Sequence, residues 1–138
     1  MKPSENEHPC RLIAVDHVEL EAEPQREADL LWFYGELIGL RLTEGDQSGD
    51  TQQTRTLRFR SDRWELRVRL VASPAIEAIA CRACFEVRNF AAIRDALDEK
   101  RWEYEYVRGL RYTERHLSLL DPAGNRVIIR RHWPTTLL

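Results

Sequence analysis

The amino-acid sequence predicts an α+β domain in which one unit, strand–helix–strand–strand–strand, occurs twice. Several short segments alternate between apolar and polar residues, as half-buried strands do. Two longer segments place apolar residues on one side of a helix. The order of segments in the first half of the chain recurs in the second half. We therefore expect the strands to form sheets with both helices packed on one face.

The first unit is predicted to begin with a strand over residues 12–21. A helix follows over residues 24–38, because Pro24 lies just inside its start and Gly39 lies just past its end, as helix termini prefer. Three more strands are predicted at residues 41–44, 54–60 and 64–71. A polar loop over residues 45–53 and a short turn at Ser61-Asp62-Arg63 connect them.

The second unit is predicted to repeat this order, with a strand over residues 79–87 and a helix over residues 90–100. Its last three strands are expected at residues 104–107, 116–120 and 126–132, the final pair joined by the turn Asp121-Pro122-Ala123-Gly124-Asn125. Alternation assigns one strand face to the helices and leaves the other polar. That polar face carries Arg58, Arg60, Glu65, Arg67 and Arg69.

Length and composition indicate one globular domain. The 138 residues, 43% hydrophobic and 32% charged, are enough for a single core, which we place at residues 11–138 with modules at about 11–73 and 78–133. Residues 1–10 are polar and are expected to form a flexible leader. The formal net charge of −2 gives no electrostatic case for nucleic acid or an anionic membrane. No apolar run has the roughly 18–20 residues that span a bilayer, so we expect a cytoplasmic protein.

Three cysteines, Cys10, Cys81 and Cys84, are expected to be reduced thiols. Cys81 and Cys84 match a C-x-x-C pattern, which zinc sites and redox dithiols share. A single such pair without further cysteine or histidine ligands at metal spacing is a weak zinc signal. In a strand, residues three apart point to opposite faces, which also disfavours a shared site.

Three stretches of the sequence, in their order and spacing, resemble the vicinal-oxygen-chelate superfamily. They are Asp16-His17-Val18-Glu19-Leu20, Phe33-Tyr34-Gly35-Glu36-Leu37-Ile38-Gly39-Leu40 and Asp121-Pro122-Ala123-Gly124-Asn125. This superfamily includes glyoxalase I, the bleomycin and fosfomycin resistance proteins and the extradiol dioxygenases. The resemblance implies two modules that form a curved mixed sheet around a ligand-holding cup, with the helices on the outer face.

The resemblance also implies a divalent metal held by the first and last strands of each module. His17 and Glu65 match those positions in the first module, but Arg82 and Ile128 occupy them in the second. Arginine stays protonated and offers only hydrogen-bond donors, and isoleucine has no lone pair. We therefore predict a degenerate metal site and no resident cofactor. If a metal is present, His17 and Glu65 are the candidate ligands.

The polar face offers a different chemistry, because planar guanidinium groups bind carboxylates and phosphates bidentately. We predict that His17, Glu65, Arg67 and Arg82 bind a small, preferably anionic, molecule; no catalytic residue is assigned. In the alternative interpretation the arginines form an ordinary solvated sheet face, or are neutralised by Glu19, Glu65 and Glu86.

Three functions stay open at this point. The first is a metal-free small-molecule-binding protein. The second is a metal-dependent lyase, isomerase or dioxygenase with a rearranged ligand set that His116 could join, and the third is a non-catalytic drug-sequestering protein. Because superfamily members commonly pair, and because the tail over residues 131–138 carries Trp133, Leu137 and Leu138, we also expect a homodimer.

Overall fold

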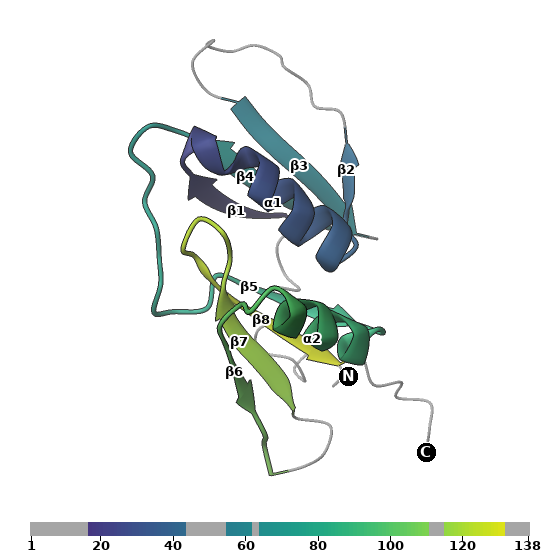
Figure 1. Cartoon of the computed structure of the whole chain (residues 1–138). Helices are drawn as coiled ribbons and strands as arrows, with labels where there is room; N and C mark the ends of the chain where they lie inside the picture. Colours follow the sequence, from purple (N-terminus) through teal and green to yellow (C-terminus); the bar gives the residue numbers. More distant parts are fainter. Residues whose placement is uncertain (1–16, 44–54, 62–63, 111–114, 132–138) are drawn as a thin grey trace, which may run out of the picture.

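The structure, a computed structural model, describes residues 17–43, 55–61, 64–110 and 115–131 (Figure 1). Its strands form two four-stranded mixed sheets, ordered β1-β4-β3-β2 and β5-β8-β7-β6. Each sheet comes from one half of the chain, as the predicted repeat requires. The two sheets are open, and no strand pair joins them within these residues. The α+β prediction with two equivalent modules is confirmed.

The first sheet contains β1 (His17–Ala22), β2 (Arg41–Thr43), β3 (Arg55–Ser61) and β4 (Trp64–Leu70). Strands β1 and β4 are parallel, whereas β3 pairs antiparallel with both β4 and β2. These bounds match the predicted strands within a few residues. The predicted residues 12–16, the loop over 45–53, and Asp62 and Arg63 of the turn lie outside the described part of the chain.

The first helical segment covers one face of the first sheet (Figure 1). It starts as a 3-10 turn at Pro24–Arg26, becomes α1 at Glu27–Leu30 and continues as a π-helical segment, η3, at Leu31–Leu37. The sequence predicted its position but not this change of winding. The N–H of Ile38 donates to the carbonyl of Phe33 at 3.1 Å, five residues back. Gly39 then ends the segment with φ of +97°, a conformation that glycine adopts easily.

The second module repeats the arrangement with β5 (Ala83–Val87), α2 (Phe90–Glu99), β6 (Tyr104–Val107), β7 (His116–Leu120) and β8 (Arg126–Arg131). Strands β5 and β8 are parallel, and β7 pairs antiparallel with β8 and β6. Figure 1 shows α2 over the second sheet as the first helical segment lies over the first sheet. His132, the predicted end of the last strand, lies outside the described residues.

One predicted boundary is wrong. The strand expected over residues 79–87 begins only at Ala83, and the preceding segment is an irregular linker. Within it, the carboxylate of Glu77 accepts hydrogen bonds from the N–H groups of Ile79 and Ala80 at 2.9 and 3.0 Å. These local bonds turn the chain away from a strand ladder and leave the side chain of Ile79 88% exposed. Cys81 consequently lies in this linker, outside β5, and among the described residues no disulfide involves Cys81 or Cys84.

The hydrophobic core lies between the sheets and the helices and is continuous across both modules. Tyr34 packs against Phe59 of its own module and against Phe85 of the other, with ring centroids 5.6 and 5.8 Å apart. Trp64 also contacts Phe85, at 5.8 Å. The strand residues on the face assigned to the helices are buried, including Leu57, Phe59, Leu66, Val68 and Leu70, and so are Ile93 and Leu97 on the apolar side of α2. Because the modules share this core, they pair within one chain.

A buried hydrogen bond joins the two modules inside the core. The hydroxyl of Tyr34, on the first helical segment, donates to Oδ2 of Asp121 at 2.6 Å, and both residues are almost fully buried. The other carboxylate oxygen, Oδ1, accepts the N–H groups of Ala123, Gly124 and Asn125 at 2.8, 2.9 and 2.9 Å. Asp121 therefore shapes the β7–β8 turn with one oxygen and binds the opposite module with the other.

Burial sets the protonation of this pair. It raises the pKa of Tyr34 well above the ordinary value of 10.0, and the neighbouring carboxylate raises it further. Burial also raises the pKa of Asp121, although its hydrogen bonds from Tyr34 and from the turn act in the opposite direction. The neutral phenol is thus the form that the folded protein stabilises.

We expect Tyr34→Phe to lower the free energy of unfolding by about 1–3 kcal/mol near neutral pH, because Oδ2 of Asp121 then stays buried without its donor. The folded protein raises the pKa of Tyr34 above 10.0, its value in the unfolded chain. Tyr34 therefore stabilises the wild-type fold below pH 10.0, and this stabilisation is lost as the pH rises above that value. The difference from wild type should therefore shrink in alkaline solution. Urea unfolding at several pH values measures it.

Tyr104→Phe is the control for this measurement. The Tyr104 hydroxyl donates to Oδ1 of Asp98 at 2.6 Å, but that contact is exposed and lies within one module. Its loss should cost less than about 1 kcal/mol. If both substitutions lowered the free energy of unfolding equally, the buried hydrogen bond between the modules would contribute no more than the exposed one.

Candidate ligand-binding face

The face of each sheet that points away from the helices is polar, and we call it the polar face. Register places every second residue of the paired strands on it. Among the described residues it carries eight arginines and five glutamates, an excess of three positive charges. The arginines are Arg41, Arg58, Arg60, Arg67, Arg69, Arg82, Arg126 and Arg130, and the glutamates are Glu19, Glu21, Glu65, Glu86 and Glu105.

Most of these arginines are half-buried, which distinguishes the polar face from a fully solvated surface. Several of them bind carboxylates on the same face. Arg67 Nε lies 3.0 Å from Glu65 Oε1, and Arg69 Nη1 lies 2.9 Å from Glu21 Oε2. A weaker pair joins Arg130 and Glu86 at 3.8 Å in the second sheet. The glutamates thus neutralise part of the arginine charge, as one alternative interpretation of the sequence expected.

The structure brings three of the four predicted ligand-binding residues onto the first sheet. His17 and Glu65 are direct partners on the parallel strands β1 and β4, and Arg67 lies two residues further along β4. The Glu65 side chain is only 15% exposed and is held by Arg67. The side chain of His17 lies outside the described part of the structure, so the backbone alone gives its place.

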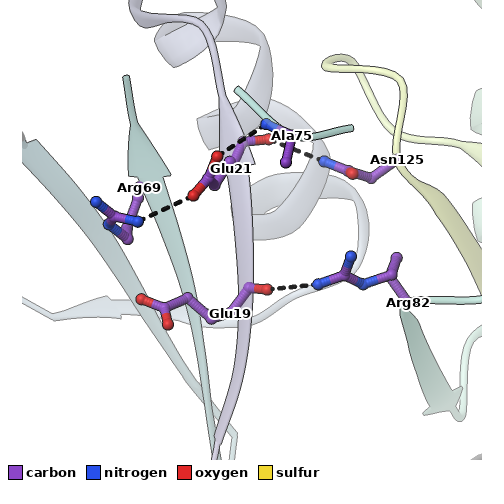
Figure 2. Close-up of polar contacts among 6 residues, drawn as sticks. All are labelled: Glu19, Glu21, Arg69, Ala75, Arg82 and Asn125. Carbon is purple, nitrogen blue, oxygen red and sulfur yellow. Dashed lines mark hydrogen bonds and ion pairs between the residues drawn. The ribbon is translucent and has the colours of Figure 1, made fainter. Parts of the chain in front are cut away.

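Arg82, the fourth predicted residue, lies just before β5 and reaches across to the other sheet. Its Nη2 donates to the carbonyl oxygen of Glu19 on β1 at 3.1 Å (Figure 2). Its backbone N–H donates to the Arg126 carbonyl at 2.9 Å, which aligns it with β8. Arg82 therefore bridges the neighbouring edges of the two sheets.

Asn125 forms a second bridge to the same edge strand. Its Nδ2 donates to the carbonyl of Glu21 at 3.0 Å, while its Oδ1 accepts the N–H of Glu77 at 3.0 Å. The Glu21 carboxylate in turn binds Arg69 and accepts the N–H of Ala75 at 2.8 Å (Figure 2). Strand β1 is an edge strand, and side chains of the second module satisfy two of its outward carbonyls.

The residues of the second module do not fit the metal site that the resemblance implies. Ile128 pairs with Cys84 in the register, whereas Arg82 precedes β5 beside Arg126. His116 lies on β7 beside Arg130, in the second sheet, and β8 and β5 lie between β7 and the first sheet. In the described part of the chain, no group of three or more His, Cys, Asp or Glu side chains could hold a metal ion. Glu65, the one described candidate ligand, already binds Arg67.

Sequence reasoning missed several residues of the polar face. Arg126 and Arg130 belong to it, and the alternation of β8, with Val127 and Ile129 buried, was the signal that could have identified them. The cross-module role of Asp121 and Asn125 had no local signal beyond a turn motif. Their near-complete burial becomes evident only when the modules pack together.

Comparisons with solved structures place this fold among known proteins. A glyoxalase family protein from Bacillus anthracis has a TM-score of 0.69 at 20% identity over 87% of this chain and 95% of its own. Lactoylglutathione lyase from Agrobacterium tumefaciens has a TM-score of 0.58 at 17% identity over 86% of this chain and 92% of its own. The third is a mutant of the fosfomycin resistance protein FosX from Listeria monocytogenes, complexed with Mn(II) and 1S,2S-dihydroxypropylphosphonic acid. It has a TM-score of 0.66 at 9% identity over 87% of this chain and 92% of its own.

No protein-family model matches the sequence, and neither does any curated protein. The chain nevertheless has the fold of the vicinal-oxygen-chelate superfamily, and the resemblance drawn from its three sequence stretches is confirmed at that level. No helix in the described residues is long and apolar enough to cross a membrane.

We expect Arg82→Ala to lower the free energy of unfolding by about 0.5–1.5 kcal/mol, because the Glu19 carbonyl on the β1 edge loses its donor. Arg88→Ala is the matched control, since Arg88 is exposed just after β5 and its loss changes the net charge equally. Chemical denaturation measures both. An Arg82 variant as stable as the Arg88 variant would show that the bridge contributes nothing.

Proposed function

We propose that this protein binds a small anionic molecule on its polar face. It does so without the divalent metal that the superfamily resemblance implies. The observation that carries the proposal is the half-buried excess of arginine on that face, beside a metal position whose second-module residues are Arg82 and Ile128. We propose His17, Glu65, Arg67 and Arg82 as ligand-binding residues. We also propose that the polar faces of the two sheets together form a cup for this ligand.

The chemistry of the side chains supports an anion. Arg82 uses one terminal nitrogen for the Glu19 carbonyl, and Arg67 uses Nε for Glu65, so each guanidinium keeps further N–H groups to donate. Charge-assisted hydrogen bonds from such groups are among the stronger polar contacts in proteins. FosX, which shares the fold, was crystallised with a phosphonic acid, a ligand of the same anionic class.

A metal-dependent enzyme is the second candidate, and one observation favours it. His17 and Glu65 are direct register partners, so their backbones are adjacent on one face as two ligands of a metal would require. Such an enzyme would need a further protein donor, and in the second module the residues paired with Ile128 in the register are Cys84 on β5 and Ser118 on β7. We propose this as the less favoured function.

Metal analysis separates the two candidates. We expect the protein, purified without chelators and then dialysed, to hold less than about one-tenth of an equivalent of Mn, Fe, Ni or Zn, because two protein donors bind such cations weakly. Plasma mass spectrometry measures the content. A stoichiometric metal that survives dialysis and disappears in His17→Ala would overturn the metal-free proposal.

Thermal-shift screening tests the ligand class. Phosphates, phosphonates and carboxylates should raise the melting temperature, and Arg82→Ala should weaken binding by about 1.5–3 kcal/mol, the range for a charged hydrogen bond. Arg82→Lys keeps the charge and controls for the structural bridge. Ligand binding without any product would favour sequestration over catalysis, while a complete lack of anion binding by wild type would contradict the proposal.

We also propose that two copies of the chain form a dimer. Related folds commonly pair, and the apolar residues of the tail, including Trp133, are predicted to contribute. Light scattering at micromolar concentration should give about twice the single-chain mass of 16.3 kDa. A mass near that of one chain would show this prediction wrong.

A further inference from the structure

Two arginines face each other at the centre of the first sheet. Arg58 of β3 and Arg67 of β4 are direct partners in the antiparallel register, and both are half-buried. Side chains at such positions have Cβ atoms about 4.5–5.5 Å apart, and like charges placed directly opposite one another are destabilising. Negative charge placed beside the pair reduces this cost.

The described residues compensate only one member of the pair. Arg67 donates Nε to Glu65, which leaves its terminal nitrogens available. No hydrogen bond or ion pair of the Arg58 side chain is found in the described ranges, while its backbone carbonyl accepts a hydrogen bond from the Thr43 hydroxyl at 3.3 Å. Glu19 is the β1 partner of Arg67, but no ion pair joins these two described side chains.

We propose that Arg58 and Arg67 together bind a phosphate or phosphonate dianion. This inference rests on the proposed function and adds Arg58 and the charge of the ligand to it. Two adjacent guanidinium groups present several N–H donors, and only the charge of Arg67 is paired, by Glu65. A tetrahedral group with three oxygens can accept hydrogen bonds from both guanidinium groups, and its charge of about −2 suits the net excess of positive charge on the polar face, whereas a carboxylate offers two oxygens and one charge. Glu19, on the neighbouring strand, repels such a ligand and limits its affinity.

The first experiment is calorimetric titration of the full chain with inorganic phosphate and with methylphosphonate. It is done at low salt and at about pH 8, where a phosphate group is a dianion. Acetate is the monoanionic comparison and should bind at least about tenfold more weakly, since one charge-assisted hydrogen bond is worth that much. Acetate that binds as tightly as phosphate would overturn the dianion assignment.

Substitutions then locate the site. Arg58→Ala should weaken phosphate binding about tenfold or more, because it removes a charged donor. Arg55→Ala is the matched control: Arg55 lies on the same strand but pairs with Glu27 at 3.1 Å on the helix side, and its loss changes the net charge equally. Its effect should stay below about twofold, as expected for a screened distant charge. Equal losses in the two variants would place the anion elsewhere.

Two further variants separate a loss of the site from a loss of the fold, because one conserves the charge of Arg58 and the other is expected to bind phosphate more tightly. Arg58→Lys keeps the charge and should lose less affinity than Arg58→Ala, since only the forked geometry is removed. Glu19→Gln should tighten phosphate binding about two- to threefold by removing a nearby like charge. A Glu19 variant that binds phosphate no more tightly than wild type would overturn the inference.

These outcomes separate the inference from the function on which it rests. If Arg82→Ala weakens phosphate binding while Arg58→Ala matches the Arg55 control, the protein still binds anions but Arg58 is not part of the site. If wild type binds neither phosphate nor methylphosphonate nor acetate, both the inference and the proposed function fail.

Discussion

The hydrogen bond from Tyr34 to Asp121 is the contact on which the arrangement of the modules depends. It lies in the shared core, where an unpaired carboxylate oxygen would be costly, and Asp121 cannot leave it without also disturbing the β7–β8 turn that it shapes. The aromatic contacts of Tyr34 with Phe59 and Phe85 restrict the phenol ring from both modules. One helix of the first module is thereby fixed against one turn of the second.

This contact also helps to fix how the second module lies against the β1 edge of the first sheet. With the turn held in place, Asn125 and Arg82 reach the carbonyls of Glu21 and Glu19, so the edge of β1 is covered by side chains in place of a further strand. Arg82 is therefore both a structural bridge and a proposed ligand residue. A single substitution at this position affects both roles, and they can be separated only when stability and binding are measured on the same variants.

The sequence predicted the fold well because local patterns determine it. Alternation identified the buried residues of β3 and β4, and glycine at position 39 correctly ended the first helical segment. It failed where tertiary or side-chain contacts override local pattern: the Glu77 carboxylate turns residues 79–80 out of the expected strand, and the first helix ends in a π-helical segment. The site was predictable in part. His17 and Glu65 do lie side by side in the register, but the pairing of Arg58 with Arg67 depends on strand register, which alternation alone does not give.

We propose that arginines on the polar face bind an anion and that no metal is held by His17 and Glu65. The most direct measurement is a crystal structure of the protein grown with both manganese(II) chloride and sodium phosphate, with anomalous data collected at the manganese edge. We expect phosphate between Arg58 and Arg67 and no anomalous peak beside His17 and Glu65. A manganese ion bound by His17 and Glu65, with no anion at the two arginines, would contradict it.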